Sequence, residues 1–231
     1  NTSTQIHNVG LPERILLGIK RNFYIFVVYL KIHMYKKINI TENSLQVLSL
    51  FTNDFSAEYY VREVAKLQKV SPRTAQLILE DLEKKGVVIS KYRGKIKNYK
   101  LFLSEQTKRY LILTEQYKAI SFFENNILIK EVIDKITLDI NGIGLIFGSY
   151  AKGLQKKGSD LDLFVVGDYS KEHIKKVSKM YSVEINVKCY PYEIFTEKLS
   201  KDFLIKEVLK NHIIFQNAEQ LIQITLQNGK D

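Results

Sequence analysis

The chain has few of the residues that stabilise small secreted domains. Its 231 residues include no tryptophan, three prolines and a single cysteine, Cys189. One cysteine excludes an intramolecular disulfide, and this favours a cytoplasmic location. Because Cys189 lies within an apolar, strand-like run, we expect its thiol to be buried and unreactive.

Long apolar runs, internal repeats and low-complexity segments are also lacking. The most apolar run, Phe23–Leu30, is far shorter than the roughly 20 residues that span a bilayer, and lysines follow it. We therefore expect no membrane partner. The first methionine is Met34, and we expect residues 1–40 to form an N-terminal extension.

Acidic residues are scarce relative to basic ones. Thirty-five Lys and Arg stand against 25 Asp and Glu, which gives a formal net charge of +10. Such an excess favours a polyanionic partner, above all nucleic acid, but it carries no information about the fold. The alternative is that the protein comes from a lysine-rich proteome.

Three short helices are predicted in the first half of the chain. Thr41 can cap the first helix, and the second is expected over about 57–68. Ser71 followed by Pro72 is typical of the start of a third helix, because proline at the first helical position sacrifices no hydrogen bond. Gly86 is suited to ending this helix.

A basic two-stranded hairpin is predicted after the third helix. Val87–Ile89 and Tyr99–Leu103 have strand character, and Gly94 in the connecting turn can adopt a positive φ. Between residues 84 and 100 there are seven basic residues and no acidic one.

This order of elements resembles a winged helix-turn-helix domain over residues 41–103. The resemblance implies that the third helix enters a DNA major groove while the wing contacts phosphates. The residues expected to contact nucleic acid are Arg73, Thr74 and Gln76 on the helix and Lys91, Arg93, Lys95 and Lys97 on the wing. Two alternatives are a dimerisation or protein-docking role for the domain and a wing whose lysines are simply solvated.

A second domain is predicted over residues 125–231, after a connecting helix and hinge over 104–124, with the hinge centred on 122–126. The apolar periodicity changes from helical to strand-like and back several times, which predicts a small mixed sheet with flanking helices. The expected fold class is therefore α+β, with a winged helix-turn-helix ahead of a mixed-sheet domain.

The most informative stretch of the chain lies in this second domain. An apolar run ends at Gly148-Ser149, and after ten intervening residues Asp160-Leu161-Asp162 begins a second apolar run. This pattern predicts a strand, a phosphate-holding turn and a second strand. Side chains two apart on a strand share a face, so Asp160 and Asp162 lie roughly 7 Å apart along the backbone. Two such carboxylates can converge on a hard cation such as Mg²⁺.

The string Gly-Ser-Tyr-Ala-Lys-Gly, followed by Gly-Ser-Asp-Leu-Asp-Leu, resembles the signature of the minimal nucleotidyltransferases of the polymerase-β-like superfamily. The resemblance covers about residues 126–215. It implies transfer of a nucleoside monophosphate from an NTP to an acceptor hydroxyl, with Mg²⁺ or Mn²⁺ as cofactor. Asp160 and Asp162 would hold the metal. The residues that would contact the nucleotide are Gly148, Ser149, Lys152 and Ser159.

Active relatives carry a third carboxylate on the neighbouring strand, predicted here over residues 183–190. Glu184 and Asn186 are the two candidates, and both are expected on the same face. With Glu184 the catalytic set would be complete. With Asn186 the site would lose an anionic ligand and a base, because an amide is neutral at pH 7. Alignment on the residues that follow slightly favours Asn186.

Three functions remain open from the sequence. The leading hypothesis is a cytoplasmic nucleotidyltransferase that binds nucleic acid through its winged helix. Family resemblance also suggests a small helical partner protein, and winged helices often form homodimers. The second hypothesis is a DNA-binding transcriptional regulator or antitoxin-like protein with a nucleotide-sensing, catalytically weak second domain. The third is an interaction protein in which both sites are degenerate.

Overall fold

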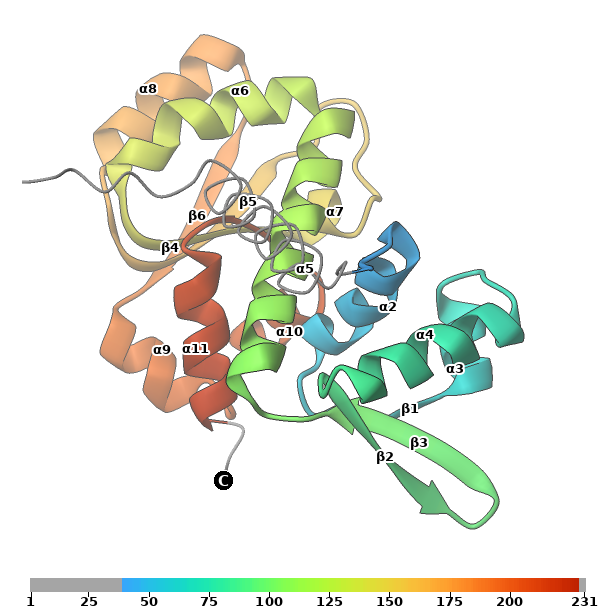
Figure 1. Ribbon diagram of the computed structural model, residues 1–231. Helices are drawn as coiled ribbons and strands as arrows, with labels where there is room; N and C mark the ends of the chain where they lie inside the picture. The colour runs from blue at the N-terminus through green and yellow to red at the C-terminus, as the bar shows by residue number, and fades with distance from the viewer. Residues whose placement is uncertain (1–38, 229–231) are drawn as a thin grey trace, which may run out of the picture. The chain divides into compact units, whose positions relative to one another are not determined.

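The computed structural model describes residues 39–228 (Figure 1). The predicted extension at 1–40, with its apolar run and Met34, lies outside the described residues except for its last two. Residues 41–228 belong to one compact unit. The described chain has the predicted α+β fold, a winged helix-turn-helix followed by a small mixed sheet with flanking helices.

The winged helix contains three helices, α2 (Glu42–Asn53), α3 (Val61–Leu67) and α4 (Pro72–Lys84). Two of the predicted caps are confirmed. The Thr41 hydroxyl accepts a hydrogen bond from the Ser44 amide, and the Ser71 hydroxyl accepts one from the Thr74 amide at 3.0 Å, ahead of Pro72. Each cap satisfies a backbone donor that the helix itself leaves unpaired.

The wing is a regular hairpin of β2 (Val88–Arg93) and β3 (Ile96–Leu101), and Gly94 in its turn has a φ of +61°. The prediction of helix from residue 57 was wrong, because Tyr59 and Tyr60 form a short strand, β1, that pairs with Tyr99 and Asn98 of β3. The Tyr59 ring packs edge-on against Phe51, with the ring centroids 5.0 Å apart. This tertiary contact holds the segment extended.

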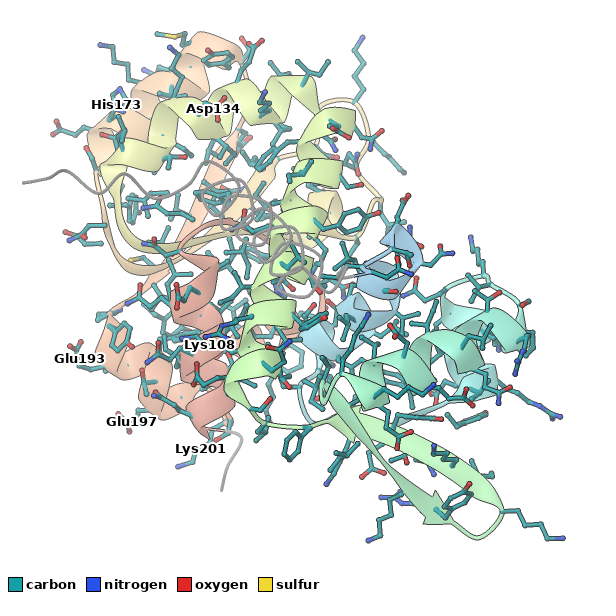
Figure 2. All side chains as sticks on the ribbon, viewed as in Figure 1. Lys108, Asp134, His173, Glu193, Glu197 and Lys201 are labelled. Carbon is teal, nitrogen blue, oxygen red and sulfur yellow. The ribbon has the colours of Figure 1, made fainter. Side chains whose placement is uncertain are left out.

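The connecting helix α5 (Glu105–Asn125) is longer than predicted. It continues through most of the expected hinge at 122–126 and ends at Asn125, with Asn126 as its C-cap. Phe122 and Phe123 are partly buried against the core of the following domain, and this packing keeps the last turn helical. Lys108 near the start of α5 contacts α11 (Ala218–Asn228), with its ammonium 3.0 Å from a carboxylate oxygen of Glu219 (Figure 2).

A buried ionic cluster surrounds Glu115 on α5. Its carboxylate is 1% exposed and accepts a 2.8 Å hydrogen bond from the Lys118 ammonium, while its other oxygen lies 3.4 Å from Nε2 of His212. Lys118 also contacts the side chains of Thr52 and Asn53 at the end of α2. Burial alone would raise the pKa of Glu115, but Lys118 and His212 together lower it to about 2. The cluster therefore joins α2, α5 and the segment before β7.

The second domain is built on a four-stranded mixed sheet with the order β6-β5-β4-β7. The strands are β4 (Ile140–Phe147), β5 (Leu161–Tyr169), β6 (Ile185–Tyr190) and β7 (Ile213–Gln216). Strand β4 runs antiparallel to both β5 and β7, whereas β5 and β6 are parallel.

Helices cover both faces of this sheet (Figure 1). On one face the core includes residues of α6 (Ile127–Ile136), which precedes the 3₁₀ turn at Thr137–Asp139, and of α8 (Lys171–Tyr181), which follows β5. The opposite face packs on α9 (Tyr192–Lys198), α10 (Phe203–Lys210) and α11. Apolar side chains therefore alternate between two cores along each central strand.

Cys189 was predicted to be buried, and this was wrong. It is exposed on β6, which is an edge strand, and its thiol points toward the Gly167 carbonyl at 3.4 Å. An edge strand has a neighbour on one side only, so a strand-like sequence pattern does not ensure burial. Among the described helices, none combines the length and the apolar character that a bilayer crossing requires.

Candidate functional site

The turn after β4 begins at Gly148, and two features of the structure require a glycine there. Its φ is +71°, a conformation that side chains strongly disfavour. A Cβ atom at this position would lie 2.2 Å from Oδ2 of Asp162. The turn therefore packs directly against one of the two predicted metal-binding carboxylates. It continues into the single helical turn α7 (Gly148–Ala151).

Strand register brings Asp160, Asp162 and Asn186 together. Asp162 on β5 pairs with Phe147 on one side and with Asn186 on β6 on the other. Asp160 lies just before β5, on the same face as Asp162. The Asn186 amide nitrogen is 3.4 Å from Oδ2 of Asp160, a long hydrogen bond.

The two aspartates repel each other. The pKa of Asp162 is raised, first by burial and then by the charge of Asp160, while Asn186 and Lys188 act in the opposite direction. A pair of like charges at a partly buried position disfavours ionisation of both carboxyl groups, and a positive charge bound between them would favour it.

Glu184 does not join this cluster. It precedes β6, which begins at Ile185 rather than at residue 183 as predicted, and its backbone carbonyl accepts a 2.7 Å hydrogen bond from the Leu161 amide. Within the described part of the chain, no group of three or more Asp, Glu, His or Cys side chains converges in a way that could hold a metal ion. Of the two candidates for the third ligand, the structure places Asn186 beside the aspartates.

Lys188 was missed by the sequence reasoning. It pairs with Phe164 of β5, two residues beyond Asp162, and Phe164 stacks on Tyr190 with ring centroids 5.4 Å apart. Along β6, Ile185 and Val187 pack against the core on the side of α6 and α8. The alternating residues Asn186, Lys188 and Tyr190 therefore share the opposite face of the sheet. The period of two between Asn186 and Lys188 was the available signal.

The other predicted nucleotide contacts are engaged within the protein. The Lys152 ammonium lies 2.9 Å from a carboxylate oxygen of Glu207 on α10. The Ser159 hydroxyl accepts a 2.8 Å hydrogen bond from the Lys156 amide, which closes the loop ahead of the aspartates. By contrast, no hydrogen bond to the Ser149 hydroxyl is formed by any residue that the structure describes.

The two histidines of the second domain have partners other than Asp160 and Asp162. His173 lies on α8 (Figure 2). Its Nδ1 pairs with a carboxylate oxygen of Asp139, which precedes β4. His212 donates from Nδ1 to the Leu209 carbonyl and belongs to the buried Glu115 cluster.

On the winged helix, side-chain hydrogen bonds link two of the predicted base-reading residues, Arg73 and Gln76, in a series along α4. Arg73 donates to the Gln76 side chain at 3.4 Å, and Gln76 donates to Glu80 at 2.8 Å. Thr74 shares a 2.8 Å hydrogen bond with the hydroxyl of the cap Ser71. Arg73 is exposed and is the first residue of this hydrogen-bonded series.

Acidic neighbours partly neutralise the wing. Arg93 lies 2.9 Å from Glu58, and Lys97 lies 2.8 Å from Glu83 and over the Tyr99 ring. Lys91 and Lys95 are exposed, and no acidic residue within 39–228 forms an ion pair with either.

Residues 128–215 match the family model described as the nucleotidyltransferase domain. This segment runs from α6 to β7 and contains the turn, both aspartates and Asn186. Over this segment the second domain is therefore similar to nucleotidyltransferase domains. A search of curated proteins found no match.

Several solved structures are similar in part. They include the YusO protein from Bacillus subtilis, with 17% identity over 44% of this chain and 73% of that chain, at a TM-score of 0.27. An adhesin competence repressor from Streptococcus pyogenes shares 15% identity over 50% of this chain and 82% of its own, at a TM-score of 0.34. A homodimeric winged helix-turn-helix DNA-binding domain from Mycobacterium bovis shares 17% identity over 53% of this chain and 92% of its own, at a TM-score of 0.28. These scores are low, so the winged-helix assignment rests on element order and strand pairing.

Proposed function

We propose that this protein is a nucleotidyltransferase that transfers a nucleoside monophosphate from an NTP to an acceptor hydroxyl. The observation that carries the proposal is the contact between the Gly148 turn and Asp162. It places a backbone segment suited to binding phosphates against a pair of carboxylates. The match of residues 128–215 to the nucleotidyltransferase domain supports the same reaction class.

The donor set suits a divalent cation such as Mg²⁺ or Mn²⁺. Asp160 and Asp162 supply carboxylate oxygens, and Asn186 carries an amide oxygen beside them. Hard cations prefer such oxygen ligands and complete their shell with water and substrate phosphates. A bound cation would neutralise charge that develops on the phosphates during transfer.

The chain's own residues would position the substrate around this pair. The Gly148 and Ser149 amides and the Ser149 hydroxyl would bind the terminal phosphates. Lys152 would exchange its partner Glu207 for a phosphate oxygen. Ser159 would act indirectly, since its hydroxyl holds the loop that precedes Asp160.

The winged helix would bind nucleic acid in the same proposal. Arg73, Thr74 and Gln76 would contact base edges, and the wing would contact phosphates. The exposed Lys91 and Lys95 support this role most directly. Arg93 and Lys97 would have to release their acidic partners first. A cytoplasmic location, where NTPs and nucleic acid are both present, belongs to this proposal. A second copy of the chain and a small helical protein remain predicted partners.

Asn186 favours a second candidate function. If the amide leaves the site without a base for the acceptor hydroxyl, the domain would bind NTP but transfer the nucleoside monophosphate slowly or not at all. The protein would then be a DNA-binding regulator that senses nucleotide.

One experiment separates the two candidates. The protein is incubated with each labelled NTP, Mn²⁺ or Mg²⁺ and a cell lysate, beside the variant Asp160→Ala/Asp162→Ala and the control Asp168→Ala. Asp168 is an exposed residue farther along β5. Label transfer by wild type and control but not by the double variant is expected. Transfer that survives in the double variant would contradict the proposed site, and NTP binding without any transfer would favour the regulator.

A further inference from the structure

The number of cations in the site follows from its anionic ligands. Enzymes that use two cations for phosphoryl chemistry hold them about 4 Å apart. Two divalent cations repel each other four times as strongly as two unit charges at the same distance. Carboxylates that bridge and flank the pair must offset this repulsion.

In this chain the flanking position is occupied by an amide. Asn186 is level with Asp162, and its NH₂ group points at Asp160 from 3.4 Å. The group therefore presents the positive end of its dipole to the carboxylates. Its oxygen could bind a cation after the amide turns over, but it would add no negative charge.

A lysine lies next to the amide on the same face. The stacking of Phe164 on Tyr190 shows which face of β6 looks toward α9, and Lys188 is on that face, level with Phe164. Phe164 and Asp162 are two residues apart on β5, so the Lys188 stem begins about 7 Å farther along the strands than Asp162. Its exposed ammonium can reach the space above the aspartates.

We propose that this site binds one divalent cation rather than two, and that the Lys188 ammonium supplies positive charge to the phosphates on the side where Asn186 replaces a carboxylate. The inference rests on the proposed function for its substrate, but the cation count can be measured without one. Two carboxylates and one ammonium give the cluster a net charge of −1. A single divalent cation changes this net charge from −1 to +1. A second cation would have no anionic ligand of its own.

The test counts Mn²⁺ bound to the full chain by electron paramagnetic resonance, without nucleotide. The variants are Asp162→Ala, Asn186→Asp/Lys188→Gln and Lys188→Gln. Lys176→Gln is the charge-matched control, because Lys176 is an exposed lysine on α8, over the other face of the sheet.

We expect one Mn²⁺ per wild-type chain, none for Asp162→Ala, and two for Asn186→Asp/Lys188→Gln. Lys188→Gln alone should tighten Mn²⁺ binding about five-fold, because it removes one unit charge roughly 7 Å from the cation in a water-like medium. Lys176→Gln should bind like wild type. With Mn²⁺ saturating, Lys188→Gln should weaken binding of a non-hydrolysable NTP analogue about ten-fold, as expected for loss of a charged contact.

Two Mn²⁺ ions on the wild-type chain, both lost in Asp162→Ala, would overturn the proposal. So would an unchanged count in Asn186→Asp/Lys188→Gln together with an unchanged affinity in Lys188→Gln. Failure of the proposed function looks different. One Mn²⁺ would still bind through Asp162, but no NTP would transfer its label.

Discussion

In the mixed sheet, the charged side chains come from neighbouring strands whose register places them in rows. In the winged helix, they come from a hairpin and a helix, and acidic neighbours pair with two of the wing's basic residues. The aspartates of the sheet repel each other, and the pKa of Asp162 is raised as a result of burial and that repulsion. The wing instead satisfies much of its charge internally. Unsatisfied charge of this kind marks a site for a counter-ion more clearly than an excess of one sign does.

The largest effect is expected from Asp162→Asn. Loss of a carboxylate that would hold the cation should lower nucleotidyl transfer by about 1000-fold, in the range of electrostatic contributions to catalysis. The same change should leave the thermal midpoint equal or higher, because it removes a repulsion from Asp160. Label transfer and differential scanning calorimetry measure the two quantities. The matched control is Asp168→Asn, and a clear fall in its midpoint or activity would show that the effects are not specific to the pair.

Glu115 tests whether the two regions depend on a shared buried cluster. Its pKa of about 2 lies below the ordinary 4.5, so the ionised form stabilises the fold. That stability is complete above about pH 4.5 and is lost as the pH falls toward 2. We expect Glu115→Gln to lower the free energy of unfolding by about 3 kcal/mol at pH 7, because removing the charge of one partner leaves the largely buried Lys118 ammonium uncompensated.

Urea unfolding of wild type and Glu115→Gln across this pH range measures how the free energy of unfolding of each protein depends on pH. The difference between the two proteins should shrink as the pH falls. A constant difference would mean that packing, and not the charge of Glu115, is responsible.

Gly148 and Gly153 form a matched pair for the contact between turn and carboxylate. Both have positive φ, but an added Cβ meets Asp162 only at Gly148, whereas nothing lies within 4 Å at Gly153. Gly148→Ala should lower the free energy of unfolding by about 2 kcal/mol and reduce nucleotide affinity, while Gly153→Ala should cost about 1 kcal/mol from backbone strain alone. Equal losses in the two variants would argue against a functional contact at Gly148.

Arg73 tests the helix of the winged domain. Arg73→Ala should weaken binding to a preferred duplex about ten-fold and relax its sequence preference, as for loss of a base contact. Fluorescence anisotropy at fixed salt with specific and scrambled duplexes measures both. An equal loss on both duplexes would assign Arg73 to phosphate contact instead.

The smallest effect is expected on the wing, where Lys95 and Lys97 can be compared directly. Lys95→Gln should weaken binding about three-fold on every sequence and reduce the salt slope by about one. Lys97→Gln should have a smaller effect, because Lys97 is already paired with Glu83. A larger effect from Lys97→Gln would show that this ion pair opens on binding. The wing's charges would then be available to a ligand, as those of the aspartates in the sheet are.

Local signals in the sequence predicted much of the fold. The cap at Ser71 with Pro72, and Gly94 in the wing turn, lie where the sequence places them because caps and turns depend on a few adjacent residues. The strand at Tyr59 was missed because it exists only through pairing with Tyr99. The last turn of α5 was missed because Phe122 and Phe123 pack on a core formed by later residues.

For the site, the sequence by itself determined the turn at Gly148 and the spacing of Asp160 and Asp162, since these follow from backbone geometry within one stretch. The tertiary structure decided which of the two candidate residues lies beside the aspartates. Glu184 and Asn186 share a face of any strand drawn from the sequence. Only the parallel register of β5 with β6, set by long-range packing, aligns Asn186 with Asp162 and brings Lys188 to the same face.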